Sequence, residues 1–98
     1  MMAKGYWVVH VDVTDLGAYQ RYREFVQPFL DQNGGRFLIR GGDQEVTEGS
    51  VKPRTVIVEW PSYEQARAAY HSAEYGEGKK LRTAISAADF AIVEGFEG

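Results

Sequence analysis

The sequence contains no cysteine. This absence excludes disulfide bonds, thiolate nucleophiles, zinc–thiolate sites and iron–sulfur clusters. The two histidines, His10 and His71, do not have the spacing of a metal-ligand pair, and a single histidine on a helix is weak evidence for haem. We therefore predict that the protein holds no metal and no cofactor.

Clustered positive charge and long apolar runs are also missing. The 11 basic residues are scattered among 14 acidic ones, with Lys79-Lys80 as the densest basic spot, and the formal net charge is −3. Proteins that bind nucleic acid gather Lys and Arg against the phosphates, so nucleic acid is not an expected partner. No run approaches the roughly 20 apolar residues of a membrane span, and the first five residues lack the apolar stretch of a signal peptide. The sequence therefore predicts a cytoplasmic protein with no membrane partner.

The residues that are present form the composition of a folded globule. Hydrophobic residues make up 44% of the chain and aromatic residues 13%, which is not the composition of a disordered chain. The 98 residues contain no linker, so we expect a single domain over residues 1–98. A chain of this length buries only about two-thirds of its unfolded surface, so association with a second copy would add stability.

Apolar periodicity predicts four strands. The first, Tyr6–Val13, alternates cleanly and places Trp7 and three valines on one face. The other strands are predicted over Arg36–Gly41, Arg54–Trp60 and Asp89–Gly95, with a polar loop or an irregular strand extension over residues 41–49.

Helices are predicted between these strands. An N-cap at Thr14-Asp15 starts a helix that reaches about Gln32, and Pro28 should kink this helix or split off its last turn. Further helices are predicted over Ser62–His71 and Lys79–Ser86, with a turn loosened by two glycines between them.

The predicted order is strand–helix–strand–strand–helix–strand, which repeats a split strand–helix–strand unit. A weak internal repeat supports this reading, because Thr14 and Ser62 both follow a strand as helix caps and lie 48 residues apart. Right-handed crossovers then give a ferredoxin-like α+β fold, with a four-stranded antiparallel sheet and helices on one face.

One face of this sheet is left without helices, and strand alternation predicts it to be apolar with a few charges. Apolar surfaces of this kind mark interaction sites, and two such faces packed together would bury both. We therefore predict a homodimer that closes into a barrel. The residues expected on this uncovered face are Tyr6, Val8, His10, Leu38, Arg40, Thr55, Ile57, Glu59, Phe90 and Ile92.

The sequence also resembles a known family. The segments GYWVVHVDVTDLGAY, GGRFLIRGGDQEV, RTVIVEWPSYEQARAAYHSAEY and FAIVEG occur in order over nearly the whole chain. They resemble domain-of-unknown-function family 1330, which is similar to the dimeric α/β-barrel superfamily. The resemblance implies a ferredoxin-like protomer and a dimer packed through its sheets. It implies no catalytic roles, because the family has no settled activity.

Three residues of the uncovered face are candidates for chemistry. His10 is the candidate catalytic residue, because imidazole titrates near neutrality and can act as a general base or hold a ligand. Arg40 could bind a carboxylate bidentately. Depending on strand register, Glu59 lies near His10, where it would fix the imidazole tautomer, or opposite Arg36 in a cross-strand salt bridge, which we favour. The alternative for each is a purely structural role within the sheet or the dimer.

Tyr6, Tyr75 and Arg82 complete the predicted substrate-binding site, and the latter two would form a lid or rim beside the loosened turn. Two functions remain open. In the first, the protein binds or transforms a small molecule in a pocket lined by these residues, with the reaction unknown. In the second, it is a non-catalytic dimeric module whose uncovered face is wholly interface. The sequence does not decide whether the protein is an enzyme.

Overall fold

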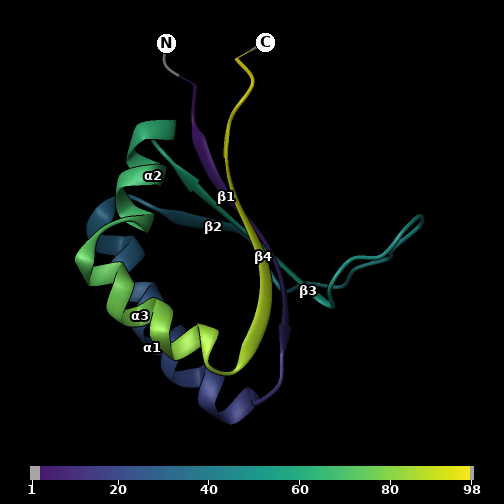
Figure 1. Ribbon diagram of the computed structural model, residues 1–98. Helices are drawn as coiled ribbons and strands as arrows, with labels where there is room; N and C mark the ends of the chain where they lie inside the picture. Colours follow the sequence, from purple (N-terminus) through teal and green to yellow (C-terminus); the bar gives the residue numbers. More distant parts are fainter. Residues whose placement is uncertain (1–2, 98) are drawn as a thin grey trace.

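The structure is a computed structural model that describes residues 3–97. It contains four strands and three helices, and the strands form one antiparallel sheet in the order β2-β3-β1-β4. The helices lie together on one face of this sheet (Figure 1). In chain order the elements are β1 (Gly5–Val13), α1 (Leu16–Asn33), β2 (Arg36–Arg40), β3 (Arg54–Trp60), α2 (Tyr63–Tyr70), α3 (Ala73–Thr83) and β4 (Ser86–Glu94).

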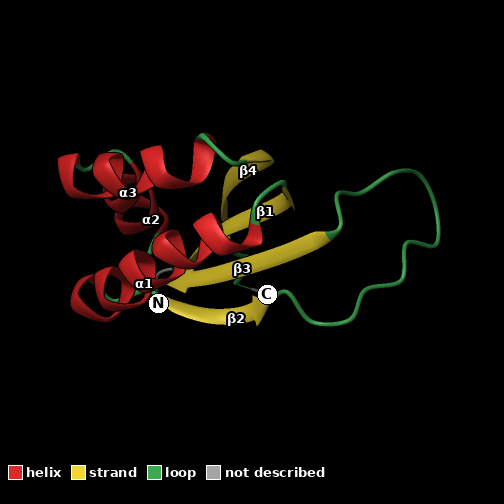
Figure 2. Cartoon of the chain, turned by 90° about the horizontal axis from the view of Figure 1, so that it is seen from below, coloured by secondary structure: helices red, strands yellow, loops and turns green. Residues whose placement is uncertain are grey.

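This architecture confirms the ferredoxin-like α+β prediction. The central strand β1 pairs with β3 on one side and with β4 on the other, and both pairs are antiparallel. Figure 2 shows the helices on one side of the sheet and the loop between β2 and β3 reaching far beyond the sheet edge. None of the helices among residues 3–97 is long and apolar enough to cross a membrane.

The core lies between the sheet and the helices. Trp7, Val9 and Val11 of β1 are buried against the helices, whereas Tyr6, Val8 and His10 alternate with them on the uncovered face. The Trp7 indole nitrogen donates a 2.8 Å hydrogen bond to the carbonyl of Ala66 in α2, which satisfies its buried N–H group. The alternation predicted for β1 is therefore confirmed.

The prediction that Arg40 and Leu38 lie on the uncovered face is wrong for Arg40. The pairing of β2 with β3 shifts between Phe37 and Ile39, so Leu38 is an extra residue in the ladder. Such a bulge reverses the alternation of the residues after it. Arg40 consequently lies opposite Val56 and faces the helices, and Ile39 takes the place on the uncovered face.

The prediction for β4 is wrong as well. Phe90 lies opposite Val9 and Ile92 opposite Trp7, so both side chains pack into the core, and the uncovered face receives their neighbours. From Phe90 to Val93 this strand is apolar on both faces, because Ala91 and Val93 alternate with Phe90 and Ile92. Alternation in the sequence therefore does not show which face of β4 is buried. In the structure, the larger side chains pack into the core.

The helices differ from prediction in two places. Helix α1 continues through Pro28 to Asn33 as one helix, so its last turn is not split off. The segment after α2 is a single helix from Ala73 to Thr83, not a loosened turn followed by a short helix. The Ser72 hydroxyl accepts from the backbone N–H of Tyr75, which is an N-cap strong enough to start α3 before the glycines.

Candidate functional site

A pocket lies between the helix-covered face of the sheet and helices α1 and α3. It leads inward from Arg23, which is exposed on α1, to the Trp7 ring, which is only 1% exposed. The cavity volume is about 30 Å³, which is room for about two water molecules. The pocket therefore connects solvent with the aromatic centre of the core.

Aliphatic and aromatic side chains form most of the pocket wall. Val9, Val56 and Val58 form its floor on the sheet, and Val26 of α1 lines its helix side. Aromatic side chains from both the sheet and α1 complete the wall: Trp7, Tyr19, Tyr22, Phe37 and Phe90.

A buried pair of tyrosines ties α1 to α3 at the edge of this pocket. The hydroxyls of Tyr22 and Tyr75 lie 2.7 Å apart and share a hydrogen bond. Burial raises the pKa of Tyr22 well above its ordinary value, and the neighbouring Tyr75 raises it further. Burial also raises the pKa of Tyr75. Both hydroxyls are therefore neutral at physiological pH, and Tyr22 is the one that lines the pocket.

The remaining pocket residues are arginines. Arg40 donates a 2.8 Å hydrogen bond to the Gln27 side chain of α1, and its guanidinium lies 4.2 Å from the centre of the Phe37 ring. Burial lowers the pKa of Arg40, and the nearby charges of Arg23 and Arg54 lower it further. The fold therefore brings the positive charges of Arg23, Arg40 and Arg54 together in one partly desolvated pocket.

Two of these arginines have buried nitrogen atoms without partners. The Nε atoms of Arg54 and Arg82 are buried and form no hydrogen bond with the protein. Arg82 is only 5% exposed and lies against the rings of Tyr22 and Phe90. A buried donor without an acceptor costs free energy, so each of these nitrogens is a ready binding group.

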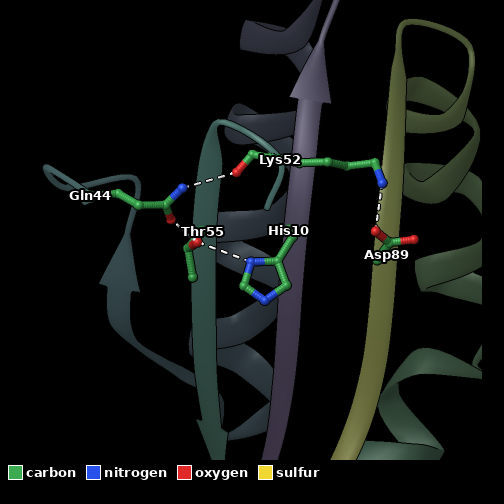
Figure 3. A network of polar contacts seen from close by, with 5 residues as sticks. All are labelled: His10, Gln44, Lys52, Thr55 and Asp89. Carbon is green, nitrogen blue, oxygen red and sulfur yellow. Dashed lines mark hydrogen bonds and ion pairs between the residues drawn. The ribbon is translucent and has the colours of Figure 1, made fainter. Parts of the chain in front are cut away.

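His10 lies on the opposite face of the sheet, in the polar network of Figure 3. Its Nδ1 atom is 3.0 Å from the Thr55 hydroxyl oxygen, and Thr55 donates its proton to the Gln44 side chain. Because Thr55 has a single hydroxyl proton, it can only accept from His10, so the neutral imidazole carries its proton on Nδ1. Beside it, Lys52 reaches across to Asp89 at 2.5 Å and lowers the pKa of that carboxyl.

Glu59 forms the salt bridge that we favoured and not the acid–imidazole pair. Its carboxylate accepts from Arg36 Nε at 2.9 Å and from the Tyr6 hydroxyl at 3.1 Å. Tyr6 stands opposite Glu59 in the β1–β3 register, whereas His10 stands opposite Thr55. The hydrogen bond from Arg36 is the main cause of a lowered pKa for Glu59.

The predicted site residues thus fall into three places. Arg40 and Arg82 come together in the helix-side pocket. Tyr6, His10 and Glu59 lie on the uncovered face, and the sheet separates them from that pocket. The expected position of Tyr75 at a rim is wrong, because its side chain is fully buried in the core. Whether any of these residues binds a ligand stays a prediction.

Sequence reasoning missed two pocket arginines, Arg23 and Arg54, and each left a signal. Arg23 lies one position after Tyr22 and four after Tyr19, so it borders the buried stripe of α1 on its exposed side. Arg54 has the same strand parity as Val56, which would have placed it on the helix side. In both cases the signal is an arginine next to apolar residues that face the core. No group of three or more potential metal-ligating side chains occurs in the described part of the chain.

Comparison with known proteins gives a family but no activity. A family model described as "Domain of unknown function (DUF1330)" matches residues 4–96, which confirms the resemblance seen in the sequence. No curated protein matches the sequence.

Several solved structures share the fold. A protein of unknown function from Rhodopseudomonas palustris is similar with a TM-score of 0.78 and 16% identity, over 100% of this chain and 86% of that one. SnoaB, a cofactor-independent oxygenase from Streptomyces nogalater, has a TM-score of 0.66 and 11% identity, over 98% and 96%. A putative antibiotic biosynthesis monooxygenase from Nitrosomonas europaea has a TM-score of 0.60 and 16% identity, over 99% and 95%. At these identities the likeness establishes the fold alone.

Proposed function

Because this chain belongs to the DUF1330 family, whose description assigns no activity, we propose a function from its own geometry: it binds a small, largely apolar molecule in the pocket between the sheet and helices α1 and α3. The observation that carries this proposal is a pocket walled by aromatic and valine side chains, whose lining includes the exposed Arg23 as well as the buried Trp7. Binding sites for small molecules are typically concave and apolar, with a few polar groups that fix orientation.

The proposal is limited to binding. His10, the candidate catalytic residue, lies on the other face of the sheet and does not line the pocket. The pocket-lining residues among 3–97 include no imidazole and no carboxylate that could serve as a general base. The oxygenase SnoaB shares the fold, which makes oxygenation of a bound molecule the catalytic activity to assay once a ligand is known.

We also propose that two copies associate through the uncovered face. Ile39 and Val93 on that face are 43% and 46% exposed, and Val8 and Ile57 lie between them. This apolar strip is flanked by the Arg36–Glu59 and Lys52–Asp89 ion pairs, which leaves a rim of charges around an apolar centre. The helix-side pocket and the proposed dimer contact lie on opposite faces of one sheet, so ligand binding and dimer formation do not exclude each other. Cytoplasmic location stays a prediction.

The pocket can be tested by nuclear magnetic resonance with methyl-labelled valine. Val9 and Val56 line the pocket, whereas Val8 and Val93 lie on the uncovered face, so the same spectrum contains probe and control. In a titration with small aromatic and aliphatic molecules, we expect the pocket methyl signals to shift and the others to stay. Shifts confined to the uncovered face would contradict the proposal.

The dimer can be tested by light scattering after size-exclusion chromatography. We expect the mass of two chains at micromolar concentration and the mass of one chain for Ile57→Asp, because a carboxylate at the centre of the strip would be buried without a partner. Glu48→Gln, in the exposed loop, is the matched control and should leave the mass at two chains. A monomeric natural protein would refute this part of the proposal.

A further inference from the structure

We propose that the ligand of the helix-side pocket is a small carboxylic acid with an apolar, aromatic or alkyl body, bound in its anionic form. This inference rests on the proposed binding function and names the chemistry of the ligand. It follows from the arginines of the pocket, from the absence of their charge partners and from the apolar wall between them.

The pocket concentrates positive charge in a protein that is negative overall. The chain has a formal net charge of −3, yet four of its seven arginines line this one pocket. They come from four different elements: Arg23 from α1, Arg40 from β2, Arg54 from β3 and Arg82 from α3. Neighbouring turns of one helix therefore do not explain the cluster, which depends on the tertiary fold.

The protein does not neutralise these charges. The ion pairs found among residues 3–97 use Arg36, Lys52 and Lys80, so none of the pocket arginines is paired with a carboxylate there. Arg40 is held by a neutral amide and an aromatic ring, and Arg54 lies over the Tyr19 ring at 5.6 Å. Rings orient a guanidinium and leave its charge in place.

Arg82 is the group that points most directly to an anion. Its side chain is more than nine-tenths buried, it lines the pocket, and its Nε has no hydrogen-bond partner in the protein. A guanidinium cannot lose its proton in a protein, so Arg82 remains charged inside the pocket. An anionic oxygen at this position would supply both the missing acceptor and the missing charge.

Arg54 adds a second such group at the sheet side of the pocket. Its Nε is also buried without a partner. Gly41 has φ +70°, and a methyl group added there would lie within 2.1 Å of Arg54 Nη1. The absence of a side chain at Gly41 thus leaves room for the Arg54 guanidinium beside the backbone that follows β2.

The apolar wall favours a carboxylic acid over inorganic phosphate. A planar carboxylate matches the two parallel donors of a guanidinium, and its carbon chain can contact the valines and rings. Phosphate has no apolar part to place there. The cavity of about 30 Å³ admits little beyond a head group, so the side chains of its wall must move apart to admit the body of the ligand.

The test is isothermal titration calorimetry, in which the affinity of each acid is compared with that of its amide. We choose benzoate, phenylacetate and hexanoate, each against its primary amide, with inorganic phosphate as the purely ionic probe. The expected result is that the best acid binds at least about tenfold more tightly than its amide, because the amide cannot form charge-assisted hydrogen bonds. The affinity should fall when salt is raised, and phosphate should bind more weakly than the best acid.

Variants locate the effect. Arg82→Gln keeps a polar side chain but removes the charge, and Arg40→Gln makes the same change at a partly exposed position where folding is less at risk. Each should reduce the acid affinity about tenfold or more and leave the amide affinity within about twofold. Arg67→Gln, on an exposed part of α2 outside the pocket, is the control and should change neither affinity.

The outcomes separate the two proposals. If acids and amides bind equally well in the pocket, the binding function stands and the anion inference is wrong. If phosphate binds as tightly as the best acid, the pocket is an ion site and the apolar body plays no role. If no probe shifts the methyl signals of Val9 and Val56, both proposals fail.

Discussion

Replacement of Gly78 by alanine tests how tightly α1 and α3 are packed beside the pocket. A methyl group built on Gly78 would lie 2.0 Å from Cε1 of the Phe25 ring, far inside van der Waals contact. The Phe25 ring is itself stacked on Phe29, at a centroid distance of 5.8 Å and an angle of 17°. The ring therefore cannot turn aside without losing contacts with its neighbour.

Two opposing effects set the magnitude. Alanine is favoured over glycine inside a helix by about 0.8–1 kcal/mol. Forcing an extra methyl group into a packed interface costs about 1–3 kcal/mol. We expect the second effect to win, with a net loss of about 1 kcal/mol from the free energy of unfolding. For a chain of this size, that loss lowers the melting temperature by about 4–8 °C.

Gly76 supplies a matched control on the same helix. A methyl group built there meets nothing within 4 Å, so Gly76→Ala should gain the full helix preference and raise the free energy of unfolding by up to about 1 kcal/mol. Urea denaturation of both variants and of the natural protein measures the difference, which we expect to be about 2 kcal/mol. The double variant Phe25→Leu with Gly78→Ala should recover part of the loss.

The result bears on function, because α3 carries Arg82 and α1 carries Arg23 and Tyr22. A methyl group at Gly78 would separate the two helices and move these groups apart. If Gly78→Ala proves as stable as Gly76→Ala, the close contact with Phe25 does not exist in solution, and the tight packing of α1 against α3 at Gly78 is wrong.

Two further predictions concern titrating groups. The lowered pKa of Glu59 means that its pairing with Arg36 stabilises the fold above about pH 4 and ceases to do so as the pH falls through the lowered pKa. Glu59→Gln should therefore cost less than about 1 kcal/mol at pH 7 and nothing near pH 2, as measured by urea denaturation at each pH, and an equal cost at both would contradict the assignment. The raised pKa of Tyr22 means that its contribution is complete below about pH 10 and is lost above it, so alkali should destabilise the natural protein more than Tyr22→Phe. At pH 7 that variant should lose about 1–3 kcal/mol, because the Tyr75 hydroxyl loses its buried partner, and an unchanged melting curve would refute the pair.

The fold could be read from the sequence because its signals are local and agree with one another. The alternation of β1 fixes which face is buried, and the caps at Asp15 and Ser62 mark where α1 and α2 begin. Phe90 and Ile92 could not be assigned, because their strand is apolar on both faces and only pairing with β1 orients it. Arg40 could not be assigned either, since a bulge is a property of two strands together and leaves no mark in one of them.

The bulge at Leu38 has a consequence for the candidate site as a whole. With regular alternation, Arg40 would join His10 on the uncovered face, and a dimer through that face would have to bury the charged guanidinium. Because the bulge turns Arg40 to the helix side, it removes a positive charge from the apolar strip and adds one to the pocket. One extra residue in β2 thereby separates an apolar surface suited to a second copy of the chain from a cationic pocket suited to an organic anion. The two proposals stand on the same structural feature and are tested by independent measurements, the mass of the assembly and the affinity for a carboxylate.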